Sequence, residues 1–480
     1  MLLSRANYYF SYNFLIVFLS SLVFKAFPLH GDERPNFVVI LCDDLGYGDI
    51  SCYGNKIIKT PNIDRLASQG IRFTDYYSPS PVCSPSRVGL LTGRTPNRAG
   101  IYDWIPSGTQ FHLEEKEFTI PKMLKRVGYA TCMSGKWHCN GKFNKKSQPQ
   151  PGDFGFDHWF ATQNNAAPSH RNPKNFVRNG EGVGELEGFS CRIVAEEANR
   201  WIENHVIENP DQPFFTFIAF HEPHEPISSP ESMISNYPNA QKKGEALYYA
   251  NVENMDFAVG MIMDCLNRNK VAENTLVIFT SDNGPETLNR YGGAWRSHGS
   301  PGDLRGMKLH THEAGIRVPG VMRWPLQIKA GQVSDEPVNS LDLMPTFANL
   351  AAGEIPIDIQ LDGTDIVNAF GKDEVIRKRP MFWCYYSALN KSKVALRDGN
   401  WKLLASIKSK NDKYLKIRSL NKSNYDLVKT AKLVDFELYN IGNDNDESLN
   451  LVDKNHDEFK RLSEAMRMMF DEVLKDSKIW

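Results

Sequence analysis

Residues 36–44 read NFVVILCDD, an uninterrupted apolar run that ends in the two acids Asp43 and Asp44. A short run that is apolar at every position is typical of a strand buried on both faces, as in a parallel sheet. Residues 274–284, NTLVIFTSDNG, have the same form and end in an acid and an amide, Asp282 and Asn283. These two stretches predict buried strands of an α/β fold.

Patterns with helical spacing alternate with further strand-like runs outward from these two stretches. Helices are predicted at 60–70, 118–128, 190–206 and 245–269, and strands at 71–77, 129–138 and 213–226. This alternation predicts a large, mostly parallel sheet sandwiched by helices. The segment 140–184 is polar, rich in Asn, Pro and Gly, and too long for a simple connection, so it is predicted to form the rim of a pocket.

The pattern changes after about Pro380. Short strand-like runs at 393–406 and 435–444 precede an amphipathic helix at 457–476. With 480 residues the chain exceeds one ordinary hydrophobic core. We therefore predict a larger catalytic domain over 32–379 and a smaller C-terminal subdomain over 380–480, built from an antiparallel sheet and a helix.

Composition and the N-terminus narrow the class of protein. The hydrophobic fraction of 41%, the charged fraction of 24% and the formal net charge of -1 are those of a globular protein and give no support to nucleic-acid binding.

The apolar run 14–24 after Arg5 predicts a signal peptide over 1–31, with an uncleaved anchor as the alternative. The protein is thus expected to be secreted or periplasmic, touching a membrane only through this segment during export. Its eight cysteines show no spacing typical of a disulfide framework.

Hard oxygen ligands follow two of the predicted strands. Ligands of open α/β sheets bind beyond the carboxyl ends of the strands, where Asp43, Asp44, Asp282 and Asn283 occur. Carboxylate and amide oxygens are what Ca²⁺ or Mg²⁺ prefers, whereas zinc would call for His or Cys. The alternative is that these acids cap the helices that follow them.

Cationic side chains are predicted near the same edge of the sheet. Lys136 and His138 are two residues apart, so on a strand both face the same way. Further candidates are His221 and His224 where a strand leaves the sheet, Lys308 in a glycine-interrupted loop, and Arg87 near the predicted start of a helix. Each alone could be a surface charge or a hydrogen-bonded histidine. Together with a metal they would suit stabilisation of a transferring phosphoryl or sulfuryl group.

The motifs, taken together, resemble those of one family. Residues 83–94, CSPSRVGLLTGR, match the C-x-P-S-R signature and the TGR segment of the type I sulfatases, within the alkaline-phosphatase-like superfamily. GYATCMSGKWH (128–138) resembles the second signature, and DDLGYGD, PHEP, SDNG and LRGMK…GIRVP follow in the family's order. The similarity covers about 36–451 and is of the arylsulfatase and N-acetylgalactosamine-6-sulfatase kind.

The resemblance implies a nucleophile and a metal. Cys83 would be oxidised to formylglycine by a separate maturation enzyme that reads Pro85 and Arg87. The hydrated aldehyde would then attack sulfur, and loss of a proton from its other hydroxyl would expel sulfate and restore the aldehyde. One Ca²⁺ would be held with an oxygen of residue 83 by four side chains: Asp43, Asp44, Asp282 and Asn283.

The resemblance also implies roles for the cationic residues. Arg87 and Lys136 would orient the formylglycine, and His138 would bond its second hydroxyl and take its proton. His224 and Lys308 would bind the sulfate and help to protonate the leaving alcohol. The expected activity is that of a sulfuric ester hydrolase.

Substrate contacts are predicted with less definition. His221 lies close enough in HEPHEP to compete for the role given to His224. Candidates for contacts with a sugar lie in the polar loop and beside Lys308: Asn164, Asn165, His170, Arg171, His310 and His312. The expected substrate is a sulfated carbohydrate, as in polysaccharide degradation. Two alternatives are a phosphatase or phosphodiesterase of the same superfamily, with a Ser or Thr nucleophile and two metals, and a non-catalytic glycan-binding module.

Overall fold

The computed structural model describes residues 34–371 and 373–480, and residues 34–480 cluster as one compact unit. The signal peptide predicted over 1–31 lies outside the described residues. Among those that are described, no helix is long and apolar enough to cross a membrane.

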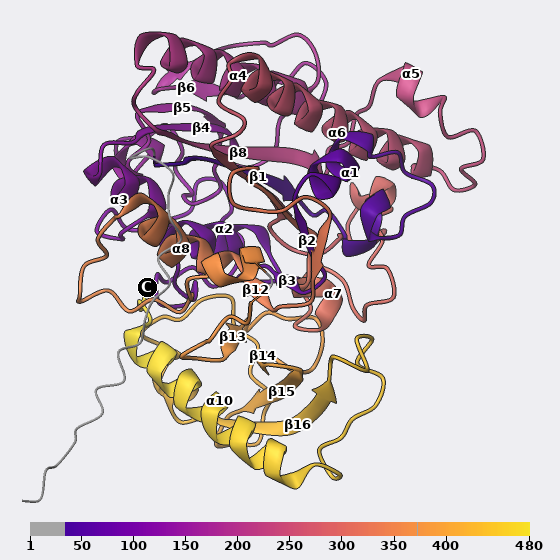
Figure 1. Ribbon diagram of the computed structural model, residues 1–480. Helices are drawn as coiled ribbons and strands as arrows, with labels where there is room; N and C mark the ends of the chain where they lie inside the picture. Colours follow the sequence, from indigo (N-terminus) through magenta and orange to yellow (C-terminus); the bar gives the residue numbers. More distant parts are fainter. Residues whose placement is uncertain (1–33, 372) are drawn as a thin grey trace, which may run out of the picture. The chain divides into compact units, whose positions relative to one another are not determined.

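A ten-stranded sheet forms the centre of the larger part (Figure 1). Its strand order is β11-β2-β10-β9-β1-β8-β4-β5-β6-β7, and the five strands from β9 to β5 are parallel. In chain order the strands are β1 Asn36–Asp43, β2 Ile71–Phe73, β4 Ala130–Lys136, β5 His158–Thr162, β6 Val177–Arg178, β7 Glu181–Gly182, β8 Phe214–Pro223, β9 Thr275–Ser281, β10 Gly320–Arg323 and β11 Gln332–Ser334.

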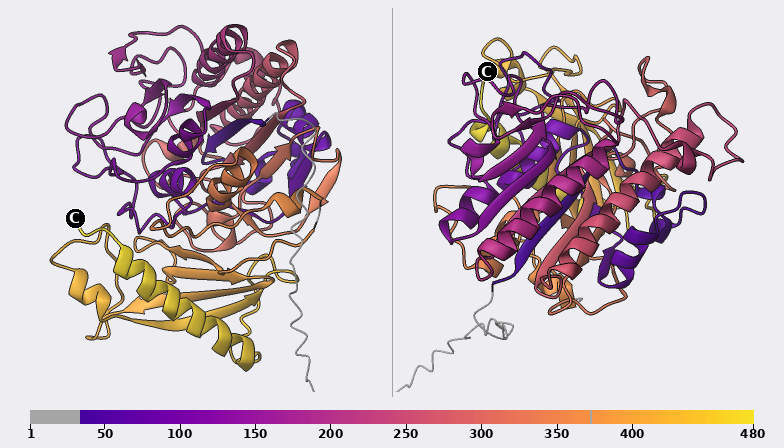
Figure 2. Two further views of the ribbon diagram at one scale, coloured as in Figure 1. Left: turned by 60° about the vertical axis from the view of Figure 1, so that its left-hand side comes forward. Right: turned by 90° about the horizontal axis from the view of Figure 1, so that it is seen from above.

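Helices cover both faces of this sheet because β1 is apolar on both sides. Phe37 and Val39 enter one core with α2, α3 and α8, whereas Val38 and Ile40 enter another with α1, α4 and α6. Figure 2 shows α4 and α6 side by side across one face. These helices are α1 Pro61–Ser68, α2 Cys83–Thr92, α3 Ile120–Arg126, α4 Ser190–Glu208, α6 Glu245–Arg268 and α8 Leu343–Ala351. The predicted fold class is confirmed.

A separate antiparallel sheet follows residue 380, with strand order β13-β14-β15-β16, and α10 packs its apolar side against it (Figure 1). The elements are β13 Met381–Cys384, β14 Val394–Asp398, β15 Trp401–Lys408, β16 Lys432–Asn440 and α10 His456–Asp476. The shorter elements elsewhere are β3 Tyr76–Tyr77, β12 Val338–Asn339, α5 Glu231–Ile234, α7 Glu313–Ile316, α9 Tyr425–Lys429 and six 3-10 turns, Tyr47–Asp49, Ser51–Tyr53, Pro151–Phe154, Ala294–Arg296, Ser340–Asp342 and Val367–Gly371.

A buried ion-pair network joins this second sheet to the α7 turn. Lys402 Nζ on β15 lies 2.8 Å from Glu313 Oε1 and 2.9 Å from Glu447 Oε1, and all three side chains are inaccessible to solvent. Tyr77 donates a 2.6 Å hydrogen bond to the other oxygen of Glu313. The charges are paired and hydrogen-bonded, which is the condition under which burial of charge is tolerated. The loop that carries Lys308 is thereby anchored at its C-terminal end.

One local prediction is wrong, and another is incomplete. The strand predicted over 71–77 is two short strands in different sheets, because the chain leaves the large sheet at Thr74 and Asp75, where Arg317 binds the Thr74 carbonyl and the Asp75 carboxylate. The segment 140–184, predicted only as a rim, also contains β5, β6 and β7 and so extends the sheet to its edge.

Candidate active site

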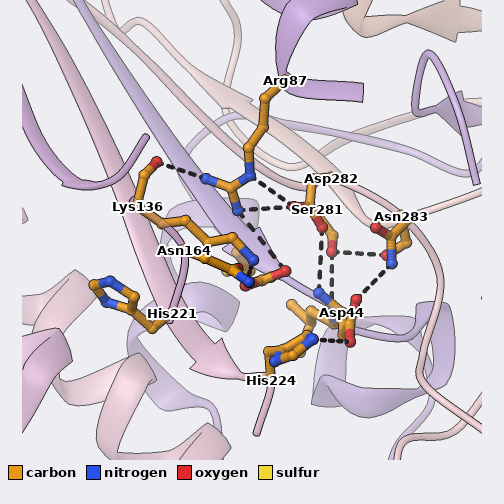
Figure 3. Close-up of polar contacts among 12 residues, drawn as sticks. Asp44, Arg87, Lys136, Asn164, His221, His224, Ser281, Asp282 and Asn283 are labelled. Atoms are coloured by element: carbon orange, nitrogen blue, oxygen red, sulfur yellow. Dashed lines mark hydrogen bonds and ion pairs between the residues drawn. The ribbon is translucent and has the colours of Figure 1, made fainter. Parts of the chain in front are cut away.

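The ends of two neighbouring strands bring the predicted acids together. β1 and β9 are parallel with Cys42 opposite Ser281, so the residues that follow lie at the same edge. The Asn283 side-chain amide donates to Asp44 Oδ1 at 2.7 Å, and the Asp44 backbone N–H donates to Asp282 Oδ1 at 3.3 Å (Figure 3). Asp44 adopts a left-handed backbone with φ of 65°, which turns the chain sharply at the end of the strand.

Helix α2 begins at Cys83 and aims Arg87 at this cluster. One helical turn separates the two residues, so both lie on the same face. Arg87 is fully buried; Nε and Nη2 donate to Asp282 Oδ2 at 2.9 and 2.7 Å, and Nη1 donates to the Lys136 carbonyl at 2.8 Å (Figure 3). A guanidinium with three such partners is held in one orientation.

Two lysines complete the charge balance. Lys136 Nζ lies 2.5 Å from Asp43 Oδ2, and Lys308 Nζ lies 2.7 Å from both carboxylate oxygens of Asp44. Three carboxylates, Asp43, Asp44 and Asp282, thus face three cations, Arg87, Lys136 and Lys308, all of them buried.

Burial makes some of these carboxylates difficult to ionise. Desolvation, followed by the charge of Asp43, raises the pKa of Asp282 to about 7. Desolvation raises the pKa of Asp44 to about 6 although Lys308 opposes it. Burial would also raise the pKa of Asp43, but Lys136 and the other nearby cations hold it well below its ordinary value. Carboxylates with raised pKa values favour a further positive charge in their midst.

The residues present fit a hard cation. Among the described residues, the buried Oδ1 atoms of Asp43 and Asn283 have no hydrogen-bond partner. Ligand atoms of Asp43, Asp282 and Cys83 lie within 4.8 Å of one another. Unpartnered carboxylate and amide oxygens are the donors that Ca²⁺ takes.

The thiol of Cys83 is not itself activated by this surrounding. Its burial raises the pKa to about 12, against the opposing effect of Lys136 and Lys308. A thiol with this pKa is almost wholly protonated at neutral pH and is a poor nucleophile.

His138 lies beside the start of α2 in a single defined tautomer. Its Nε2 is 3.1 Å from the Ile105 carbonyl oxygen and therefore carries the proton, which leaves Nδ1 with a free lone pair. Nδ1 is buried without a partner in the described part of the chain. Burial, followed by the charge of Lys136, lowers the pKa of the His138 imidazole well below the usual value, so the ring is neutral.

The two histidines of HEPHEP occupy different surroundings. His224 Nδ1 donates to the Glu225 carbonyl at 2.7 Å, and its Nε2 lies 3.5 Å from Asp44 Oδ2. His221 Nε2 instead lies 2.8 Å from the hydroxyl oxygen of Thr162. Desolvation, followed by Lys308, lowers the pKa of His224 to about 3. Of the two, His224 is the one that reaches the acidic cluster.

The predicted substrate residues separate into those near the cluster and those buried or exposed elsewhere. Asn164 is drawn with the charged cluster in Figure 3, and its Oδ1 and that of Asn165 are buried without a hydrogen-bond partner among the described residues. His170 is fully buried, 3.6 Å from Glu222 Oε1, whereas Arg171 is exposed.

His310 and His312 lie in the loop after Lys308. Their rings stack at 6.0 Å, and His312 is buried with Nε2 accepting a 3.5 Å hydrogen bond from the Asn390 amide. Desolvation, followed by Lys402, lowers the pKa of His312 to about 3. His312 therefore packs toward the C-terminal sheet as a neutral ring.

Sequence reasoning missed a second group of residues around Lys308. Glu286 Oε2 lies 3.8 Å from Lys308 Nζ, and its carboxylate receives two hydrogen bonds from Arg290 at 2.7 and 2.6 Å. Burial, followed by the charge of Asp44, raises the pKa of Tyr291. The sequence signal that could have indicated these residues is their position in the loop directly after SDNG.

Comparisons with known proteins agree with this arrangement. Residues 35–354 match the model of the Sulfatase family, and residues 307–476 match that of the N-sulphoglucosamine sulphohydrolase C-terminal region. The chain is 35% identical to human arylsulfatase A, over 77% of this chain and 74% of the relative. It is 34% identical to rat N-acetylgalactosamine-6-sulfatase and 30% identical to human steryl-sulfatase, over 73% and 70% of this chain and 68% and 70% of the relatives.

Solved structures give the same result. The structure of Ps i-CgsB in complex with k-i-k-neocarrahexaose superposes with a TM-score of 0.76 at 29% identity, covering 93% of this chain and 94% of that one. A structure described under the metabolism of multiple glycosaminoglycans by Bacteroides thetaiotaomicron superposes with a TM-score of 0.73 at 25% identity, over 91% and 99% of the two chains. The fold of the present chain is thus the alkaline-phosphatase-like fold of these enzymes. The chain belongs to the sulfatase family and is a sulfuric ester hydrolase.

Proposed function

We propose that the protein hydrolyses a sulfate ester of a carbohydrate, using a formylglycine made from Cys83 and one Ca²⁺ bound by the strand-end cluster. The observation that carries the proposal is the pair of buried oxygens of Asp43 and Asn283 that have no hydrogen-bond partner among the described residues and lie beside Cys83 and Asp282. Bound Ca²⁺ would supply positive charge where the sulfate oxygens and the nucleophile meet. Asp43, Asp44, Asp282 and Asn283 would hold it.

In this proposal residue 83 acts as formylglycine rather than as a thiol. Formylglycine would supply a hydrated aldehyde, whose hydroxyl attacks sulfur as the alcohol leaves. The buried guanidinium of Arg87, fixed by Asp282, would keep residue 83 and the incoming sulfate in line. Lys136 would neutralise charge on the same side of the site.

Proton movements follow from the tautomers of the histidines. The free lone pair of His138 Nδ1 makes this atom the base that accepts the proton from residue 83. Burial opposes the charge of Lys308, but Asp44 and the other nearby negative groups hold its pKa well above the usual value, so Lys308 keeps its proton where the sulfate would bind. His224 Nε2 is unprotonated until a sulfate anion raises its pKa. Lys308 and His224 together would bind the sulfate and protonate the leaving oxygen.

His224 and His221 should differ in a mutational test. Replacement of His224 by alanine removes a group 3.5 Å from Asp44 and should lower kcat by about 100-fold, the scale of one acid–base group. Replacement of His221 removes a ring bonded to Thr162 and should lower kcat by less than about tenfold. Steady-state kinetics on an aryl sulfate measures both. A larger loss in the His221→Ala enzyme would reverse the assignment.

The substrate class rests on the relatives. N-acetylgalactosamine-6-sulfatase is named for a sulfated sugar, and Ps i-CgsB was solved with a neocarrahexaose.

The proposal also includes export, maturation and domain organisation. A signal peptide over 1–31 would direct export to the periplasm or outside, and a formylglycine-generating enzyme would mature the protein. A catalytic domain over 32–379 would be followed by a subdomain over 380–480.

Hydrolysis of 4-nitrophenyl sulfate and 4-nitrophenyl phosphate by the matured protein tests the reaction type. The sulfate should be turned over with a kcat/KM at least about 100-fold higher, because the proposed mechanism relies on formylglycine and one Ca²⁺ rather than on a Ser or Thr nucleophile with two metals. A panel of sulfated mono- and oligosaccharides, assayed for released sulfate, then identifies the sugar. A preference for the phosphate ester would overturn the proposal.

A further inference from the structure

A cavity of about 70 Å³ lies next to the start of α2. Its wall is formed by residues 100–106 and Phe111 on one side and by Arg418 and Ser419, from the C-terminal part of the chain, on the other. Trp104 is 41% exposed, which is unusual for so large an aromatic side chain, and it lines this cavity. The mechanism described above uses none of these side chains.

Three contacts tie the cavity to residue 83. The Ile105 backbone N–H donates to the hydroxyl oxygen of Ser84 at 3.0 Å, and the Ile105 carbonyl accepts the hydrogen bond from His138. Tyr385 packs in one buried cluster with Cys83, and its hydroxyl donates to Asp103 Oδ1 at 3.0 Å. Asp103 and Ile105 both line the cavity. A group in the cavity is therefore one layer of residues away from the nucleophile.

The lining combines an aromatic face with an acceptor and a donor. The Asp103 carboxylate is held by Tyr385 and by a 2.9 Å hydrogen bond from the Trp104 backbone N–H. Arg418 is exposed, and within residues 34–371 and 373–480 its guanidinium has no ion pair or hydrogen bond. A carboxylate beside a guanidinium can bond two adjacent hydroxyls, one as acceptor and one as donor. A pyranose offers such hydroxyls at its edge and C–H groups on its face.

We propose that this cavity is a carbohydrate subsite that determines which sulfate esters reach residue 83. The face of the sugar that carries or adjoins the sulfate lies on Trp104, and its hydroxyl edge enters the cavity to bond Asp103 and Arg418. About 70 Å³ accommodates substituents of a ring rather than a whole sugar. The inference rests on the proposed function, because it places a sugar at that same site. An aryl or steroid sulfate, which lacks the hydroxyl edge, does not use the subsite.

Two variants and two controls test the subsite by kinetics. Trp104→Ala and Arg418→Ala should each lower the ratio of kcat/KM for a sulfated oligosaccharide to kcat/KM for 4-nitrophenyl sulfate by about tenfold or more, mainly through KM. Phe257→Ala removes a similarly exposed aromatic on α6, and Arg200→Ala removes an exposed guanidinium on α4; neither should change the ratio. An unchanged ratio in the Trp104→Ala and Arg418→Ala enzymes, or an equal loss on both substrates, overturns the inference.

A binding measurement separates this inference from the proposed reaction. Isothermal titration of neocarrahexaose and of a chondroitin 6-sulfate disaccharide into the Cys83→Ala protein requires no turnover. Binding of either sugar, weakened about tenfold by Trp104→Ala, supports the subsite even if no sulfate is released from any ester, a result that would count against the proposed function alone. Failure of both sugars to bind, or binding that Trp104→Ala leaves unchanged, overturns the subsite.

Discussion

Cys83→Ala should abolish sulfate release, lowering kcat/KM by at least about 1,000-fold, while the protein remains folded. The reason is positional. Residue 83 begins α2 with its side chain among Asp43, Asp282 and the cations, and the alanine methyl group has no oxygen to attack sulfur. The change removes only the polar end of one buried side chain from an otherwise intact cluster, so the thermal midpoint should fall by no more than about 4 °C.

Cys132→Ala is the matched control for this variant. Cys132 is a fully buried thiol on β4, and it takes no part in the charged cluster. It should retain its activity within about threefold. None of the eight cysteines, all of which lie in the described residues, forms a disulfide, so neither substitution removes a covalent link. A Cys83→Ala protein with more than about a tenth of the parental activity would contradict the assignment.

Removal of the metal should cause the second large loss. Dialysis against a chelator is expected to lower kcat/KM by at least about 100-fold and to lower the thermal midpoint, and added Ca²⁺ should restore both. Without the cation, the Oδ1 atoms of Asp43 and Asn283 stay buried with no hydrogen-bond partner in the described part of the chain, and burial disfavours the ionised forms of Asp44 and Asp282. A cation bound only by the folded protein stabilises it by about 2.7 kcal/mol at a hundred times its dissociation constant.

Elemental analysis measures the Ca²⁺ content, and the activity assay measures the loss and recovery of sulfate release. The active protein should contain one Ca²⁺ per chain, and an Asp282→Asn variant should lose metal and activity together. A matched control is Asp211→Asn, a carboxylate in the exposed turn before β8, which should leave both unchanged. Protein shown to be free of metal and still fully active would contradict the proposed role of the cluster.

The sequence allowed the main strands to be predicted because their burial leaves a pattern that is easy to detect. β1 and β9 are apolar throughout, and their terminal acids indicated where the site would form. The short strands β6, β7, β11 and β12 were missed because two or three residues are too few to show a period. α8 was also missed, since a short apolar helix resembles a buried strand in a single sequence.

The candidate site likewise contains residues that could be predicted from the sequence and residues that could not. Its charged residues lie in motifs that a sequence displays directly, such as SDNG for Asp282 and Asn283. The surroundings of Cys83 cannot be found from motifs in this way. Tyr385 is about 300 positions away in the chain and contacts Cys83 only because the second sheet packs against the start of α2. The difference between His221 and His224 likewise depends on where β8 ends and on which ring then faces Asp44.

The chemical state of residue 83 in active protein is the most direct test of the account. Mass spectrometry of the peptide that contains residues 83–87 should show sulfur replaced by oxygen with the loss of two hydrogens, and the modified fraction should rise in proportion to the specific activity of each preparation. Fully active protein in which residue 83 is unmodified cysteine would contradict the proposed mechanism.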